Sequence, residues 1–292
     1  MNTGWTLRRA AALASIAAAA ACGGDTGSIT GPPPPPVDTT KTSYLGFDVS
    51  GYPGDAAMAA WKYPSSPYYW AGYYLPAPCH RTDTSWSGKY ATLHAMGWGV
   101  LAIYVGQQDW SQIPADIAVA ERAQPSELLA PMRDYSTLFT TCSASLLSVD
   151  QGRAEALDAI AKLEGDGFPT RSIVYLDVEY VSTVSPALLD YIRGWLTGIL
   201  ADGTYRPGIY MAKSNSATIH DAAHATAAQY AAPDPAFWIA SSVGFDTTRN
   251  PTDVGLSYAS VWQGAFDVSR SYDGVALKID EDVATTRSPS AP

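Results

Sequence analysis

The apolar positions after residue 43 fall into short runs separated by segments with a helical repeat. Short apolar runs bounded by Gly, Pro or polar residues predict buried β-strands. Eight such runs lie at Tyr44–Val49, Tyr68–Leu75, Gly99–Val105, Ile173–Glu179, Pro207–Met211, Phe237–Ser241, Tyr258–Gln263 and Val275–Asp280. Helical patterns occupy Asp55–Lys62, Ser87–Met96, Gln151–Glu164, Pro186–Asp202 and Asn215–Tyr230. This alternation predicts an α/β protein with a parallel sheet.

Eight strand–helix units favour a closed (β/α)8 barrel of the TIM type over an open doubly wound sheet. The clearest helix has Ser185 as N-cap, Pro186 at its first position and Gly203 after its end. Connections become shorter after the fifth strand, which predicts irregularity in the last three units. No Gly-rich phosphate motif follows the first strand, which argues against a dinucleotide-binding fold. We therefore expect one barrel over residues 44–287, followed by a short tail, 288–292.

A long segment, about Gln107 to Ser148, interrupts the pattern after the third strand. A βα loop of this length lies on the face where barrels carry their active sites. Cys142 belongs to this insertion and Cys79 to the loop after the second strand, so both are expected on one face. In an exported chain such a pair predicts a disulfide. It would either form a rigid wall of a substrate cleft or only stabilise a long loop.

The N-terminal residues form a targeting segment. Arg8 and Arg9 precede an Ala-rich apolar run, so residues 1–21 are expected to be a signal peptide. Small residues end this run directly before Cys22, as in the lipobox of bacterial lipoproteins, where the cysteine thiol is lipidated. The alternative is ordinary secretory cleavage nearby. Residues 22–43 contain Pro32–Pro36 and predict a stiff linker. The chain is thus expected to be an exported lipoprotein at the cell envelope, on the periplasmic or extracellular face.

Charge and composition narrow the possible partners. The net charge is −10, and losing Arg8 and Arg9 makes it about −12, which argues against nucleic acid as a partner. Nine Trp and 18 Tyr against six Phe suit the stacking of sugar faces, although these rings also fill cores. Cys and His residues lack metal-ligand spacing, so no metal or cofactor is expected. We expect a monomer that meets the membrane only through its lipid anchor.

Four acids are expected to gather at one end of the barrel. Side chains alternate along a strand, so Asp177 and Glu179 share the inward face at the end of the fourth strand. Taken alone, this pair could simply cap the next loop. Alternation also turns Asp48 inward at the end of the first strand, and Asp280 inward at the end of the eighth. Lys278 would then project into the barrel one layer below Asp280.

Several motifs carry a family resemblance that spans Tyr44 to about Ala284. They are Gly46-Phe47-Asp48-Val49-Ser50, Ile103-Tyr104-Val105-Gly106-Gln107, Tyr175-Leu176-Asp177-Val178-Glu179, Tyr205-Arg206-Pro207-Gly208-Ile209-Tyr210, Trp238-Ile239-Ala240 and Val261-Trp262-Gln263, followed by Asp280. With these motifs the chain resembles the lysozymes of glycoside hydrolase family 25. It is more similar still to a bacterial glycoside hydrolase-like domain of unknown function that is related to those lysozymes.

The resemblance implies a glycosidase acting on peptidoglycan-like glycan. Glu179 matches the general acid, Asp177 the carboxylate that stabilises the reacting sugar, and Asp48 and Asp280 the supporting acids. Glycoside cleavage needs such a pair, and crowded carboxylates can keep one acid protonated. The residues expected to contact substrate are Tyr210, Trp238, Trp262 and Gln263. Lys278 and the insertion depart from the pattern, so the alternative is an inactive barrel that binds or remodels cell-envelope polysaccharide.

Overall fold

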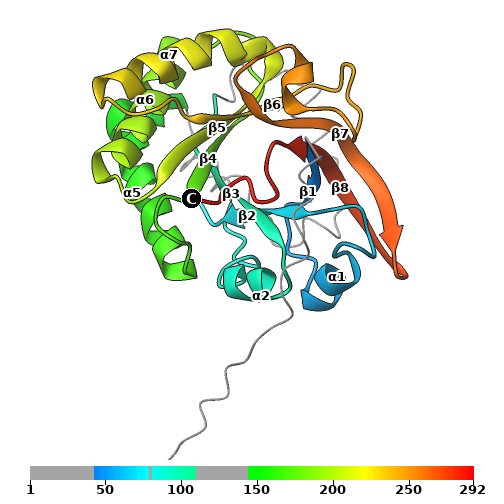
Figure 1. The fold of residues 1–292 in the computed structure, drawn as a ribbon. Helices are drawn as coiled ribbons and strands as arrows, with labels where there is room; N and C mark the ends of the chain where they lie inside the picture. The colour runs from blue at the N-terminus through cyan, green and yellow to red at the C-terminus, as the bar shows by residue number, and fades with distance from the viewer. Residues whose placement is uncertain (1–42, 79–80, 110–143) are drawn as a thin grey trace, which may run out of the picture. The chain divides into compact units, whose positions relative to one another are not determined.

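The strands expected from the apolar runs close into a barrel in the computed structural model, which describes residues 43–78, 81–109 and 144–292. Neighbouring strands follow sequence order around the barrel, from β1 to β8 (Figure 1). The strands are β1 (Tyr44–Asp48), β2 (Trp70–Leu75), β3 (Gly99–Val105), β4 (Ile173–Val178), β5 (Arg206–Ala212), β6 (Ala236–Ala240), β7 (Ala259–Tyr272) and β8 (Val275–Ala284). The prediction of a single closed barrel is confirmed.

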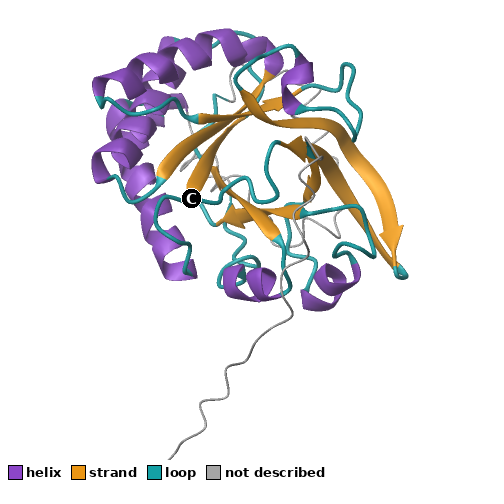
Figure 2. Cartoon of the chain, viewed as in Figure 1, coloured by secondary structure: helices purple, strands orange, loops and turns teal. Residues whose placement is uncertain are grey.

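Helices cover the outside of the barrel unevenly. The α-helices are α1 (Asp55–Ala60), α2 (Tyr90–Ala95), α5 (Val149–Asp166), α6 (Pro186–Asp202) and α7 (Ser216–Gln229), and the 3-10 helices are η2 (Ala144–Leu146), η3 (Lys213–Asn215) and η4 (Pro251–Val254). Helix α6 begins with the Ser185 side chain accepting from Leu188 N and ends at the left-handed Gly203, as expected. Only η4 lies between β6 and β7, and a hairpin joins β7 to β8. The predicted irregularity of the last three units is confirmed, and Figure 2 shows this hairpin extending beyond the barrel.

The direction of β8 differs from the prediction of an all-parallel sheet. This strand runs antiparallel to both β7 and β1. Asp273 and Gly274 make the turn before it with φ of 48° and 77°, the conformation that an Asp-Gly hairpin turn requires. Strand β8 therefore enters the barrel from the mouth and continues to Ala284. Asp280, which pairs with Asp48, lies within the strand and not at its end.

The reversed direction also corrects the expected position of Lys278. In an antiparallel strand, residues before Asp280 lie farther out from the barrel. The exposed Lys278 instead forms a 2.9 Å ion pair between its Nζ and Asp267 Oδ1, on the β7–β8 hairpin. It therefore does not lie below the acids inside the barrel.

Apolar side chains form two cores, one on each face of the barrel wall. The outer core packs the strands against the helices and includes Phe47, Leu176 and Trp195. The inner core fills the barrel with side chains from alternating strand positions: Tyr44, Trp70, Leu101, Ile103, Tyr175, Trp238, Val261 and Ala284. A Cβ at Gly46 would lie 2.1 Å from the Trp70 ring, so this inward position has no room for a side chain. The lower barrel is solid, and any site must lie at the mouth.

The residues expected to be a tail, 288–292, are part of the barrel floor. Ser290 N donates to Val100 O over 3.0 Å, and Ile173 N donates to Ser290 O over 3.0 Å, so the tail bridges β3 and β4. The Ser290 hydroxyl also accepts from Ala102 N at 2.7 Å. In Figure 1 this red segment runs from β8 across the barrel to the C-terminus. It closes the end opposite the mouth.

The predictions for the three cysteines concern residues outside the described ranges. Cys22, Cys79 and Cys142 belong to the undescribed ranges, together with the signal segment, the linker and most of the insertion after β3. Lipidation and the disulfide therefore stay predictions. Within the described ranges, none of the helices combines the length and the apolar character needed to span a membrane.

Candidate active site

The four acids predicted from the strand ends meet around one tyrosine. Tyr210 lies on the inward face of β5, and its register partner on β4 is Asp177. Burial raises the pKa of the Tyr210 hydroxyl well above its usual value, and the negative charges of Glu179, Asp177, Asp48 and Asp280 raise it further. Side chains from β1, from β8 and from the end of β4 therefore converge at the mouth beside β5.

Gln263, on β7, connects two of these acids to Tyr210. Its Oε1 accepts from the Tyr210 hydroxyl at 2.6 Å. Its Nε2 donates to Asp48 Oδ2 at 2.8 Å and to Asp280 Oδ2 at 3.2 Å. The Tyr74 hydroxyl completes this network with a 2.6 Å bond to Asp48 Oδ1. Gln263 was predicted to contact substrate, but its side chain is buried and bonded on both ends within the site.

A fifth acid, Asp282, belongs to the same group and was missed from the sequence. It is fully buried on β8, pairs in register with Gly46 and accepts from Trp238 Nε1 at 2.9 Å. The signal that could have found it is the alternation from Lys278 through Asp280, which continues to Asp282. It went unused because the strand was expected to end at Asp280.

The carboxyl groups of β1 and β8 have raised pKa values. Burial raises the pKa of Asp48, although hydrogen bonds from Tyr74, Gln263 and Asp282 oppose the rise. Burial and the charge of Asp48 raise the pKa of Asp280 to about 8. Asp282, buried beside both acids, has a pKa raised well above its usual value. Neighbouring buried carboxyls cannot all ionise, so this set shares protons around neutral pH.

The β4 pair is fixed differently, through its main chain. Asp177 is the last inward residue of β4, and Glu179 follows the strand with a partly exposed side chain. The buried Gln108 donates from Nε2 to Asp177 O at 2.8 Å and accepts from Glu179 N at 3.0 Å. Its neighbour Gln107 is held in turn by a 2.7 Å bond to Glu155 Oε1. Sequence reasoning missed Gln108, whose partners are main-chain atoms of another strand.

A buried arginine stands close to the acids and was also missed. The Arg81 guanidinium lies 4.3 Å above the Tyr74 ring, donates to Ser50 O, and lies 3.3 Å from Asp83 Oδ2. The charges of Asp177 and Asp48 favour its ionised form, which its burial disfavours. The cation expected near the acids is therefore Arg81 and not Lys278. It comes from the loop after β2, where no periodic pattern assigns a direction to a side chain.

The aromatic residues predicted as sugar platforms occupy different layers. Tyr210 is half-buried at the mouth, and its ring packs edge-to-face on Trp238 at 4.6 Å. Trp238 is 2% exposed and lies in the inner core. Trp262 is fully buried in the outer core and donates from Nε1 to Ser241 O at 2.7 Å. The expected stacking on sugar does not agree with the position of Trp262, because alternation turns its ring away from the barrel interior.

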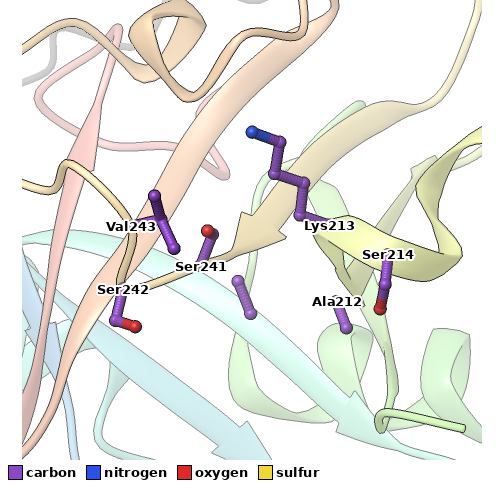
Figure 3. Close-up of a pocket in the computed structure, with 7 residues that line it drawn as sticks. Ala212, Lys213, Ser214, Ser241, Ser242 and Val243 are labelled. Atoms are coloured by element: carbon purple, nitrogen blue, oxygen red, sulfur yellow. The ribbon is translucent and has the colours of Figure 1, made fainter.

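Space for a ligand opens beside Tyr210. A pocket of about 510 Å³ lies at the ends of β5 and β6 and is lined by Ala212, Lys213, Ser214, Ala240, Ser241, Ser242 and Val243 (Figure 3). Among the described residues, no group of three or more His, Cys, Asp or Glu side chains is arranged to hold a metal ion. The chemistry available at the mouth is thus that of carboxyl groups, a buried cation and an adjoining open pocket.

Solved structures with the same fold include a bacterial lysozyme and a spore cortex lytic enzyme. The chain matches an uncharacterized B. stearothermophilus protein with a TM-score of 0.51 and 16% identity, over 82% of this chain and 95% of that one. The spore cortex lytic enzyme SleM of Clostridium perfringens gives a TM-score of 0.51 and 15% identity, over 85% and 68%. A bacterial lysozyme from Streptomyces coelicolor gives 0.50 and 17%, over 84% and 92%. At these identities the likeness is one of fold.

Sequence comparison gives the family. No curated protein matches the chain. A family model does, the Rv2525c-like, glycoside hydrolase-like domain, and it covers residues 59–284. This range runs from α1 to the last residue of β8 and contains the acids of β4 and β8. The chain therefore belongs to the Rv2525c-like, glycoside hydrolase-like domain family.

Proposed function

We propose that this protein is a glycoside hydrolase that cleaves a peptidoglycan-like cell-wall glycan. Glu179 is the general acid that protonates the leaving oxygen, and Asp177 is the carboxylate that stabilises the reacting sugar. The observation that carries the proposal is the convergence of Asp177, Glu179, Asp48 and Asp280 on the Tyr210 hydroxyl at the barrel mouth. A fold shared with a lysozyme and a spore cortex lytic enzyme supports the choice of substrate.

The surroundings of the two residues suit these roles. An oxocarbenium-like transition state needs an anion on one side of the sugar and a proton donor at the leaving oxygen. Gln108 fixes the main chain on both sides of Val178 and so sets the spacing of Asp177 and Glu179. The cation of Arg81 favours an ionised carboxylate at Asp177. Asp48 and Asp280 support the site as hydrogen-bonding groups around Gln263.

The test is Glu179→Gln, which removes the acid but keeps the shape of the side chain. We expect release of reducing ends from purified cell-wall material to fall at least a hundredfold, because general acid catalysis contributes about 10²–10⁴. Glu164→Gln is the matched control, since Glu164 is an exposed acid on the outer helix α5. Thermal unfolding confirms that both variants fold. Undiminished release by Glu179→Gln would refute the assignment.

The second function is a barrel that binds cell-envelope polysaccharide without cleaving it, and the buried Arg81 beside the acids is compatible with binding as well as with catalysis. A fixed cation offsets negative charge in the site, as a barrel that only binds cell-envelope polysaccharide would allow. Affinity for glycan fragments, measured by calorimetry, with no reducing-end release from the wild type would support this function. Release that depends on Glu179 would exclude it.

We further propose that the barrel is exported and held at the cell envelope by a lipid on Cys22, with residues 1–21 removed. The sequence around Cys22 supports this proposal. In a bacterial host, labelled palmitate should be incorporated into the full-length chain and lost in Cys22→Ser. Labelling that persists in Cys22→Ser, or is absent from the wild type, would contradict lipidation at this residue.

A further inference from the structure

The pocket begins one inward residue beyond the proposed catalytic site on β5 and β6. Ala212 follows Tyr210 on the inward face of β5, and Ala240 follows Trp238 on the inward face of β6. The two alanines pair in register, and their small side chains leave open space directly above Tyr210. A ligand that reaches Tyr210 and its four acids therefore has this pocket as its next contact.

The wall of the pocket on the β6 side is tied to the acid network. Ser241 N donates to Gln263 O at 2.9 Å, and Ser241 O accepts from Trp262 Nε1 at 2.7 Å. Both bonds involve the main chain of Ser241, so its hydroxyl is available to the pocket. Figure 3 shows Lys213 and Ser241 extending into the space between the ends of β5 and β6. The main chain of Ser241 thus connects the wall of the pocket to Gln263.

Charge distinguishes this pocket from the rest of the mouth. Of the residues that line it, all within the described ranges, only Lys213 is charged. Lys89, Lys162 and Lys278 each pair with an aspartate, whereas Lys213 has no such partner in the part of the chain that the structure describes. The Lys213 Nζ lies over the loop after η4, 3.7 Å from where a Cβ on Gly255 would be. The pocket thus contains one ammonium group that has no carboxylate partner among the described residues.

This arrangement selects a particular kind of substituent. The acids at Tyr210 repel an anionic group, while the Lys213 ammonium attracts one. Ser241 and Ser242 add hydroxyl groups that can donate to carboxylate oxygens. The two neighbouring regions together match a sugar chain that is neutral where it meets the acids and carries a negative charge one position away.

We propose that the Lys213 pocket is a subsite for a carboxylate carried by the glycan. The inference rests on the proposed function for the direction in which the glycan lies, and it adds one feature of the substrate: an oligosaccharide with a carboxylate-bearing substituent. In a wall glycan that carboxylate comes either from the lactyl ether of a muramic acid or from an attached peptide. Both present the same group to Lys213.

The experiment compares affinities for charged and neutral ligands of equal length. The probes are a neutral chitin tetrasaccharide, a peptide-free tetrasaccharide with muramic acid, and the same tetrasaccharide with its peptides. Calorimetry gives Kd for each in the wild type and in Lys213→Met, Lys213→Glu and Lys213→Arg. We expect the ratio of charged-ligand to neutral-ligand affinity to fall three- to tenfold in Lys213→Met and further in Lys213→Glu. Lys213→Arg should keep the ratio within about twofold.

Arg153→Glu supplies the matched control. Arg153 is exposed on α5, outside the mouth, and its reversal changes the net charge by the same amount as Lys213→Glu. An equal fall in the affinity ratio for Arg153→Glu would make the effect one of overall charge and overturn the subsite. A ratio unchanged in Lys213→Met and Lys213→Glu, or no binding of charged fragments by the wild type, would overturn it as well.

The outcomes separate this inference from the proposed function. An affinity ratio that depends on Lys213, without reducing-end release, would support the subsite and contradict the proposed hydrolase. Reducing-end release that depends on Glu179, with an affinity ratio that does not depend on Lys213, would support the hydrolase and contradict the subsite. If only the peptide-bearing ligand responds to Lys213, the carboxylate belongs to the peptide. If the peptide-free ligand responds equally, it belongs to the sugar.

Discussion

Two sets of carboxyl groups face each other across the mouth, and they differ in burial and in hydrogen bonding. Asp48, Asp280 and Asp282 lie on the antiparallel pair β1 and β8, in adjacent register positions. Burial raises the pKa of each above its usual value, and repulsion from Asp48 adds to the rise for Asp280 and Asp282. Gln263 donates hydrogen bonds to Asp48 and Asp280, Tyr74 donates to Asp48, and Trp238 donates to Asp282. This set is a rigid hydrogen-bonded frame.

The second set, Asp177 and Glu179, stands at the end of a parallel strand. Its anchoring residue, Gln108, bonds main-chain atoms and leaves the side chains to face the mouth. Arg81 supplies a positive charge on this side. Under the proposed function, residues of one chemical type serve as frame or as reacting groups according to burial and neighbours. The predictions that follow test this division.

The largest effect is expected where the frame is held together. Gln263→Leu leaves the Tyr210 hydroxyl, Asp48 and Asp280 without their shared partner in a buried place. We expect the free energy of unfolding to fall by about 3 kcal/mol, because several buried polar groups lose a hydrogen bond together. Urea denaturation measures it. Gln151→Leu removes one 2.8 Å bond to Glu155 and should lose only about 1 kcal/mol. Equal losses would show that Gln263 does not join the frame.

Gln108→Leu tests the reacting set, and its effect should appear in turnover. Without the two main-chain bonds, the carboxyls of Asp177 and Glu179 shift relative to the substrate, and a shift of about 1 Å can lower kcat about a hundredfold. Steady-state kinetics on soluble wall fragments separate kcat from KM. The free energy of unfolding should fall by only about 1–2 kcal/mol. A kcat within twofold of the wild type would mean that Gln108 does not position the pair.

The sequence predicts the barrel and the gathering of four acids because both depend on local periodicity. Strand alternation turns Asp48, Asp177 and Asp280 inward, and strand neighbours in a closed barrel bring them together. The direction of β8 depends instead on the turn before it. The Asp273-Gly274 dipeptide is a hairpin signal that the prediction did not use, because it extended the regular βα pattern of the earlier units to the end of the chain. Because the direction of β8 was predicted wrongly, Lys278 was expected inside the barrel and Asp282 was not recognised as an inward acid.

Other residues of the site have no periodic signal at all. Arg81 follows β2 in a loop, and Gln108 follows β3 at the start of the insertion. Arg81 donates to Ser50 O, 31 residues away, and Gln108 donates to Asp177 O, 69 residues away, so only the folded chain identifies these partners. The sequence also did not decide whether Trp262 is buried. The direction of its side chain depends on the register of β7, which is irregular after Gln263. Tertiary contacts decide these positions.

The pH dependence of stability offers a second test of the frame. Asp280 has a pKa of about 8 in the folded protein against 3.8 ordinarily. Between these values the folded chain holds a proton that the unfolded chain has released. Stability therefore falls as pH rises from about 4 to 8, by up to about 1.4 kcal/mol per pH unit for one proton. Asp280→Asn should make this slope shallower in urea titrations from pH 5 to 8. Glu164→Gln should leave it unchanged, and an unaltered slope in Asp280→Asn would place the proton elsewhere.

The smallest effect is expected at Arg81, whose charge acts on one member of each set. Arg81→Met removes the cation whose field lowers the pKa of Asp48 and favours an ionised Asp177. The acidic limb of the pH–activity profile should move up by about half a pH unit, since Arg81 is near these carboxyls without bonding them. Arg81→Lys keeps the charge without the planar stacking on Tyr74 and should leave the limb in place. A shift in both variants would make the stacking responsible. An unmoved limb in Arg81→Met would mean that burial alone distinguishes the reacting set from the frame.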